Sequence, residues 1–221
     1  SCAVELSKDE YFGLHLGDYF EATHLGIVGY VIMNCSTIGD AFEKFKQYYK
    51  IVADGEHLNI ETEGDYAKLT YSIIDTTFKN KRHISELTFA SIMKTVKLLT
   101  GQSLILEKAN FKHSEPKDIT DHEKIFNTEI NFSADEYSLV FKKEYLNLEL
   151  KQANSELLSD LEGTAKNVLT KICPEDDFRS KVLQICAKHF TNSIPKIEQV
   201  AELLVMSVRN LQIKLKQEDT T

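Results

Sequence analysis

The 221-residue sequence predicts an α+β domain followed by helices in its last quarter. Runs that alternate apolar and polar residues around short turns predict antiparallel hairpins. Apolar residues at helical spacing between these runs predict flanking helices. The order β-α-β-β-α occurs twice along the chain, so we expect a duplicated β-α-β-β-type domain with antiparallel sheets and flanking helices, followed by a helical linker and a helix-turn-helix.

The first repeat is expected to begin after residues 11–26, a glycine-punctuated segment that predicts a short helix and a turn. The run LGIVGYVIMN at residues 25–34 is apolar and rich in β-branched residues, which predicts a buried strand. Residues 37–52 then place aromatic and aliphatic side chains at helical spacing. We expect this helix to end at Gly55, since glycine is common just after a helix.

The repeat continues with residues 57–74, which alternate with period two on both sides of Gly64. This pattern predicts a β-hairpin with Gly64 in its turn. Residues 84–99 carry an apolar stripe at helical spacing, and Gly101 suits the position after the last helical residue. We therefore expect a hairpin followed by a long amphipathic helix.

The second repeat has the same order with little sequence identity to the first. We expect a strand at 103–112, a short helix at 118–126, a hairpin at 129–142 and a helix at 154–170. Each β-α-β-β unit has to cover its sheet with its own helices. The junction would leave a concave seam, which is where small-molecule pockets usually lie.

The segment after residue 173 is expected to consist of short helices separated by breaks and turns. Residues 173–177 break the chain, a helix is expected at 178–189, and residues 193–195 form a turn, with Pro195 at or near the start of the following helix. Residues 196–204 and a helix capped by Ser207 then form two short helices around a sharp turn. This is the outline of a helix-turn-helix, the element that places a helix in the DNA major groove. Spacing alone leaves an ordinary helical hairpin equally open.

The outward-facing residues of the second helix include types that read base edges or phosphates. The candidate DNA contacts are Ser207, Arg209, Asn210, Gln212, Ile213 and Lys216. The net charge of −8 argues against a protein that coats nucleic acid, so any DNA contact must be local.

Composition also limits the compartment and the chemistry. The four cysteines show no C-x-x-C spacing, which indicates free thiols in a reducing cytoplasm. The first residues lack the pattern of a secretory signal, and no apolar run approaches the roughly 20 residues of a membrane span. The sequence contains no G-x-S-x-G, no P-loop and no H-E-x-x-H. We therefore expect no enzyme, no cofactor, no metal site and no membrane partner.

Polar residues that interrupt apolar elements near the expected seam are candidates for binding a small molecule. Arg82 among them would suit an anionic ligand. The candidates are Tyr30, Asn34, Tyr71, Arg82, His83, Glu86 and Tyr137.

Residues 200–216, VAELLVMSVRNLQIKLK, resemble the first helix-turn-helix of AraC/XylS-type transcription regulators, in which a pattern like vAerLgmSxRtLqRxLk is common. The preceding part resembles the arabinose-binding-like effector domain of that family in three fragments. These are LGIVGYVIMNCSTIGDAFEKFKQYYKIVADG, NFKHSEP and INFSADEYSLVFKKEYLNLEL. The resemblance extends from about Phe12 to Gln217.

The resemblance implies a ligand-responsive bacterial regulator. It would have an effector-binding and dimerisation domain at 1–152, a linker helix at 153–174 and the first helix-turn-helix subdomain, at 175–221, of a truncated DNA-binding domain. Its implied partners are operator DNA, an unidentified small-molecule effector and a second copy of itself. Val205 stands where the family often has glycine, Ile213 where it often has arginine, and a second helix-turn-helix is not present. We therefore expect this chain by itself to bind DNA poorly.

Two other functions stay open on the sequence alone. One is a small-molecule carrier or enzyme built on a duplicated β-α-β-β fold. The other is a dimerisation module without a ligand, whose interior would be filled by side chains.

Overall fold

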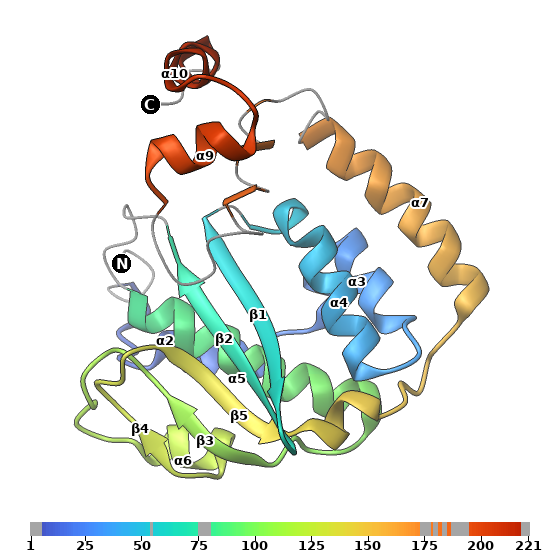
Figure 1. The fold of residues 1–221 in the computed structure, drawn as a ribbon. Coiled ribbons are helices and arrows are strands. Elements are labelled where there is room, and N and C mark those ends of the chain that lie inside the picture. Colours follow the sequence, from blue (N-terminus) through green and yellow to red (C-terminus); the bar gives the residue numbers. More distant parts are fainter. Residues whose placement is uncertain are drawn as a thin grey trace. The chain divides into compact units, whose positions relative to one another are not determined.

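The computed structural model describes residues 6–53, 55–74, 81–172, 178, 181–182, 185–186 and 195–217. The chain divides into a first unit, residues 1–166, and a second unit, residues 167–221, and each is described by itself. The first fourteen described elements are labelled in Figure 1 where space allows, and the last of them, α7, continues into the second unit. In chain order they are α2 (Phe12–Asp18), η1 (Ala22–Leu25), α3 (Ile27–Met33), α4 (Ile38–Tyr48), η2 (Tyr49–Ile51), β1 (Glu56–Glu63), β2 (Tyr66–Ile73), α5 (Lys81–Thr100), β3 (Leu106–Asn110), α6 (Thr120–Phe126), β4 (Ile130–Asn131), β5 (Tyr137–Lys142), η3 (Lys143–Asn147) and α7 (Ser155–Ile172).

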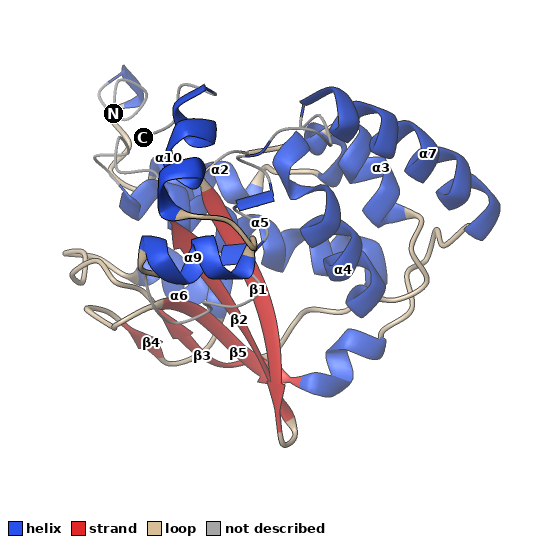
Figure 2. Ribbon diagram, turned by 45° about the horizontal axis from the view of Figure 1, so that its top comes forward, coloured by secondary structure: helices blue, strands red, loops and turns tan. Residues whose placement is uncertain are grey.

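The first unit is built on one five-stranded sheet with the strand order β1-β2-β5-β3-β4. Alternate residues of β2 are buried, from Ala67 to Ile73, so one side of the sheet belongs to the core. Helix α5 lies against this side, where Phe89 packs its ring on Tyr71 and Phe111. Figure 2 shows α5 and α2 beside the red strands. The mixed α+β class predicted from the sequence is confirmed.

The predicted first hairpin and the two helices that flank it are confirmed. β1 and β2 pair antiparallel from Glu56–Ile73 to Glu63–Tyr66, and Gly64 has a positive φ of 57° in the turn. Helix α4 begins at a capping box in which the side chain of Thr37 accepts from the Asp40 N–H at 3.1 Å. This reciprocal cap satisfies donors that the first helical turn leaves free.

The strand predicted at residues 25–34 is wrong, because this segment forms helix α3. Val28, Val31 and Ile32 are buried on one side of the helix, at the spacing of a helical stripe. Gly29 lies against the carbonyl oxygen of Ala22, where a Cβ atom would overlap it. A short apolar run does not distinguish a buried strand from a buried helix, and tertiary packing selected the helix here.

The hairpin predicted at residues 129–142 is also wrong. Strand β4 pairs parallel with β3, whereas β5 lies between β2 and β3 and is antiparallel to both. Strand β5 is therefore central, and its residues from Tyr137 to Leu139 are all buried. Period-two alternation marks a strand but does not identify its partner. With one sheet and no strand at 25–34, the duplicated β-α-β-β arrangement and its seam find no support in the structure.

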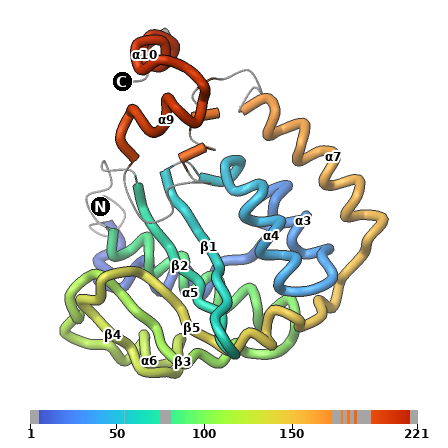
Figure 3. The backbone as a smooth tube through the Cα atoms, in the orientation of Figure 1, coloured from blue at the N-terminus to red at the C-terminus, as the bar shows by residue number. Residues whose placement is uncertain are grey.

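The second unit contains α9 (Ile197–Leu203) and α10 (Val208–Gln217); in the tube of Figure 3, α9 is seen from the side and α10 nearly along its axis. The turn between them is closed by a hydrogen bond from the Met206 N–H to the Ala201 carbonyl at 3.0 Å. Ser207 caps α10 by accepting from the Asn210 N–H at 3.2 Å. The predicted pair of short helices around a sharp turn is thus present. The helix predicted at 178–189 falls largely outside the described residues.

Helix α7 falls within the linker predicted at residues 153–174. The predicted domain boundaries at 152/153 and 174/175 stay predictions. Within the part of the chain that the structure describes, no helix is both long enough and apolar enough to cross a membrane.

Candidate functional site

An apolar cavity of about 270 Å³, partly open to solvent, is formed by the first unit. Its wall comes from helices η1, α3, α4 and α5, the start of β1 and the residues that join these elements. The lining residues are Phe20, Leu25, Ile32, Ile38, Ala41, Phe42, Phe45, Tyr49, Val52, Ala53, Glu56, Leu58, Ile84, Leu87, Thr88, Ser91, Ile92, Thr95, Val96 and Leu99. Most of these side chains are hydrocarbon, which is the usual character of a small-molecule site with a few polar groups.

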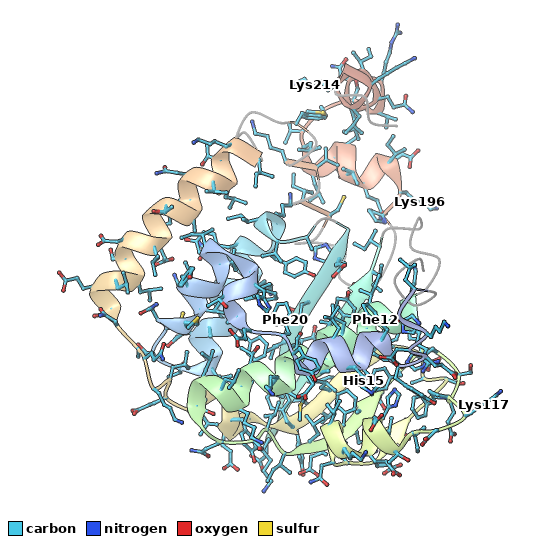
Figure 4. The ribbon with its side chains drawn as sticks, turned by 180° about the vertical axis from the view of Figure 1, so that it is seen from behind. Phe12, His15, Phe20, Lys117, Lys196 and Lys214 are labelled. Carbon is cyan, nitrogen blue, oxygen red and sulfur yellow. The ribbon has the colours of Figure 1, made fainter. Side chains whose placement is uncertain are left out.

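The helices around the cavity are held in place by close backbone approaches. Gly13 and Gly17 of α2 face α5, where a Cβ atom on Gly13 would overlap the His83 carbonyl oxygen. Phe20 follows α2 and reaches the cavity wall; its position relative to Phe12 and His15 is labelled in Figure 4. Elsewhere in the lining, Phe45 of α4 and Tyr49 of η2 pack edge to face with ring centroids 5.1 Å apart.

Glu56 is the charged residue of the described cavity wall. Its Oε2 atom accepts one hydrogen bond from the Tyr49 hydroxyl and one from the Tyr71 hydroxyl, each at 2.7 Å. Burial, together with the neighbouring carboxylate, raises the pKa of both tyrosines well above the usual range. Both hydroxyls therefore stay protonated and donate to Glu56.

Three hydroxyl side chains of α5 supply the remaining polar wall. Thr88 donates to the Ile84 carbonyl at 2.9 Å, and Ser91 donates to the Thr88 carbonyl at 2.8 Å. Because these two protons are used within the helix, the two hydroxyl oxygens keep lone pairs that can accept a hydrogen bond. Thr95 lies one turn further along the same wall.

A second polar feature of the first unit is a buried cluster around Glu86 of α5. Glu86 is fully buried, and its Oε1 accepts from Arg82 Nε at 2.8 Å. The Nε2 atom of His122, from α6, lies 2.9 Å from the same oxygen. His113 Nε2 and His83 Nδ1 lie 3.6 Å and 3.7 Å from the Glu86 carboxylate oxygens. The cluster thus joins α5, α6 and the segment after β3.

The protonation states in the cluster follow from burial and from these contacts. Burial raises the pKa of Glu86, but the hydrogen bonds from His122 and Arg82 and the Arg82 charge outweigh it, so the pKa is lowered. Burial lowers the pKa of His83 and of His113, which favours neutral rings. Within the described residues, no group of histidine, cysteine and acidic side chains is arranged to hold a metal ion.

The cluster retains unused hydrogen-bonding capacity. Among the described side chains, five buried atoms of the cluster have no hydrogen-bond partner: Arg82 Nη2, His83 Nδ1, Glu86 Oε2, His113 Nε2 and His122 Nδ1. Buried polar atoms of this kind are uncommon in native proteins and call for an explanation.

The structure brings together some of the ligand-binding residues predicted from the sequence. Arg82, His83 and Glu86 belong to the buried cluster, and Tyr137 lies next to it, with its ring centroid 6.4 Å from that of His113. The ring of Tyr71 lies 6.3 Å from that of Tyr137 and its hydroxyl reaches Glu56. These residues do not line the cavity themselves.

Tyr30 and Asn34 lie elsewhere, on the outer side of α3. Tyr30 is 49% exposed, and the Asn34 side chain donates to the Tyr30 carbonyl. Their assignment rested on the strand that proved to be a helix. All seven residues stay predictions as ligand contacts.

Sequence reasoning missed the polar residues that do line the cavity. Thr88, Ser91 and Thr95 recur at i, i+3 and i+7, so a hydroxyl stripe at helical spacing was visible in the sequence. Glu56 and Tyr49 had no such signal, because their meeting depends on how α4 and β1 pack. His113 and His122 also gave no motif, since they converge on Glu86 only in the fold.

In the second unit, the six predicted DNA contacts are all exposed: Ser207, Arg209, Asn210, Gln212, Ile213 and Lys216. They lie on α10 or at its cap. Leu211, on the opposite side of α10, is 1% exposed and packs with Val200 and Ala201 of α9. A helix held by one apolar side and free on the other is able to enter a DNA groove. The six contacts stay predictions.

Comparison with known proteins agrees with the resemblance found in the sequence. Residues 2–150 match the family described as "Arabinose-binding domain of AraC transcription regulator, N-term". The chain is 21% identical over 219 residues to the ornithine utilization regulator of Pseudomonas aeruginosa. That match covers 99% of this chain and 64% of the relative, so the chain spans about two thirds of the relative's length.

A solved structure is also similar. The crystal structure of the transcriptional regulator CdpR from Pseudomonas aeruginosa superposes with a TM-score of 0.58 at 18% sequence identity. The match covers 95% of this chain and 68% of CdpR. At this identity the similarity establishes the fold.

Proposed function

The chain belongs to the AraC-type transcription regulators with an arabinose-binding-like domain, and from that premise we propose that it couples a small-molecule effector to DNA binding. The first unit would hold the effector in the cavity between α3, α4, α5 and β1. The second unit would contact operator DNA through α10. A homodimer acting in the cytoplasm is part of the same proposal.

The cavity is the observation that carries the effector half of the proposal. A pocket of about 270 Å³ lined by side chains of α3, α4, α5 and β1 is much larger than the water-sized voids left by ordinary packing. A module that only dimerises has no need of such a space. The mostly apolar wall with a few polar groups has the composition of ligand pockets.

The arrangement of α10 supports the DNA half. Arg209, Asn210 and Gln212 are exposed near the start of the helix, which is where recognition helices contact bases. Arginine and glutamine have the donor geometry that pairs with guanine and adenine edges. The Ser207 side chain accepts from the Asn210 N–H and so fixes the start of α10, and the positive end of a helix dipole favours a nearby phosphate.

The DNA half is tested with the intact regulator and a duplex selected from a random library. We expect Arg209→Ala to weaken binding by about 5- to 150-fold, the effect of losing about 1–3 kcal/mol at a base contact. The matched control is Lys108→Ala, which removes an exposed positive charge from β3 in the first unit. Equal effects of the two substitutions would show that α10 does not read the duplex.

The effector half is tested by screening metabolites for a thermal shift and then measuring DNA affinity with each compound that binds. Ornithine is one probe, because ornithine utilization is named in a relative. A coupled effector is expected to change DNA affinity by about 5- to 150-fold. If compounds that fill the cavity leave DNA affinity and transcription unchanged, the proposed coupling is wrong.

A further inference from the structure

We infer that the cavity of the first unit binds an apolar primary amine, with the amine nitrogen beside Glu56. The inference rests on the proposed function, in that it names the chemical class of the effector for the same cavity. Three properties of the described wall lead to it: the volume, the charge and the direction of the hydrogen bonds.

The volume sets the size of the apolar body. An apolar cavity of about 150 Å³ is known to bind benzene. The present cavity, at about 270 Å³, therefore has room for one ring and a short alkyl chain. Side chains such as Leu25, Ile92 and Val96 surround this space and offer it no hydrogen bond.

The charge of the wall selects against anions. Among the described lining residues Glu56 carries a negative charge, and lysine, arginine and histidine are not represented. A bound carboxylate would lose its hydration beside a like charge and without a cation, which is a costly burial. An ammonium group would instead form a charge-assisted hydrogen bond with Glu56.

The hydrogen bonds of the wall select for a donor. The hydroxyl protons of Tyr49 and Tyr71 are directed to Glu56 Oε2, and those of Thr88 and Ser91 to backbone carbonyls. The wall and the Tyr71 hydroxyl behind Glu56 are thus rich in acceptors, whereas the hydroxyl protons of these four residues are already used. A primary amine supplies up to three donors and, when charged, no acceptor, which complements this arrangement.

The test compares three ligands with the same body and different ends. The 4-phenylbutyl amine, alcohol and carboxylate are each titrated into the full chain at pH 7.5, with calorimetry as the readout. We expect the amine to bind about tenfold or more tighter than the carboxylate, with the alcohol between them. Absence of amine binding up to millimolar concentration, or carboxylate binding as tight as the amine's, overturns the inference.

A substitution at Glu56 separates charge recognition from the fit of the apolar body. Glu56→Gln keeps the shape of the side chain and an oxygen that accepts from the tyrosines. We expect it to weaken the amine about tenfold or more while the alcohol changes by less than about threefold. The alcohol thus reports that the variant is folded. An amine-to-alcohol ratio that stays at the wild-type value overturns the role of Glu56.

The outcomes distinguish this inference from the proposed function. Amine binding without any change in DNA affinity would support the ligand class and refute the coupling. A carboxylate that binds the cavity and changes DNA affinity would refute the ligand class and support the coupling.

Discussion

Glu86→Gln is expected to destabilise the first unit by about 3 kcal/mol, because it removes the charge at the centre of the buried cluster. Glu86 is fully buried and bonds to both Arg82 and His122. Removing one partner of a buried ion pair costs about 3–5 kcal/mol. Glutamine retains a carbonyl acceptor for one of the two donors, which places the expected loss at the lower end of that range.

The assay is urea unfolding followed by tyrosine fluorescence. The chain has no tryptophan, and its nine tyrosines all lie at or before Tyr145, so the signal reports the first unit. With a denaturant slope of about 2 kcal/mol/M, a loss of about 3 kcal/mol lowers the midpoint by about 1.5 M. Glu107→Gln, on an exposed position of β3, is the matched control and is expected to change stability by less than about 0.5 kcal/mol.

The difference between the wild-type chain and Glu86→Gln also depends on pH. The pKa of Glu86 is lowered in the folded state, so the ionised group stabilises the fold above its unfolded value of 4.5. That stabilisation is lost as the pH falls through the folded-state pKa, and the two chains should then converge. A Glu86→Gln chain as stable as the control at pH 7.5 would refute the role assigned to the cluster.

Three further outcomes are expected. Gly13→Ala should destabilise the first unit by about 1–3 kcal/mol, because the added Cβ atom would overlap the His83 carbonyl. Gly163→Ala should instead stabilise α7 by up to about 1 kcal/mol, because there is open space around Gly163 and alanine favours the helix. Urea unfolding measures both changes in stability. Val205 has a positive φ of 54° and is 93% exposed, so Val205→Gly should raise the melting temperature of the second unit by relieving strain of about 1 kcal/mol; a lower value contradicts this. Burial lowers the pKa values of His83 and His113, so the unfolded chain takes up protons more readily than the folded one and stability should fall as the pH drops below about 6.5. The urea midpoint should therefore decline between pH 7.5 and 5.5, and His113→Gln should make this decline smaller.

The sequence predicted elements well where local signals and tertiary packing agree. The first hairpin was predicted because two alternating runs flank Gly64, and in the structure Gly64 takes a positive φ in the turn. Helix α4 was predicted from its apolar stripe, and in the structure a cap formed by Thr37 and Asp40 fixes where it begins. The short helices α9 and α10 were predicted because Ser207 caps the second of them.

The errors arose where long-range packing decides the structure. The segment at 25–34 is apolar enough for either a strand or a helix, and contact of Gly29 with the Ala22 backbone accompanies the helix. Strand β5 was predicted to pair in a hairpin with the strand just before it, yet it inserts between β2 and β3. No local sequence pattern distinguishes the helix at 25–34 from a strand or identifies the partners of β5. These two differences are why the structure does not show the expected duplication.

The candidate sites also contain both residues that local sequence patterns predict and residues that come together only in the fold. The outer residues of α10 were predictable, because their exposure follows from helical periodicity around Leu211. The cavity was not, because its wall joins residues from Phe20 to Leu99 that meet only in the fold. Of its polar groups, the hydroxyls at 88, 91 and 95 were accessible to sequence reasoning, whereas Glu56 was not.

The central claim, that a ligand in the cavity alters DNA binding, is tested most directly by thermodynamic reciprocity. With the intact regulator, the affinity of 4-phenylbutylamine is measured by calorimetry with and without the selected duplex, and duplex affinity is measured with and without the amine. We expect both affinities to change by one common factor of about 5- to 150-fold. We also expect Ser91→Leu, which places a larger side chain on the cavity wall, to abolish the change while leaving ligand-free DNA binding intact. Unchanged DNA affinity at saturating amine, or an unaltered response in Ser91→Leu, would contradict the claim.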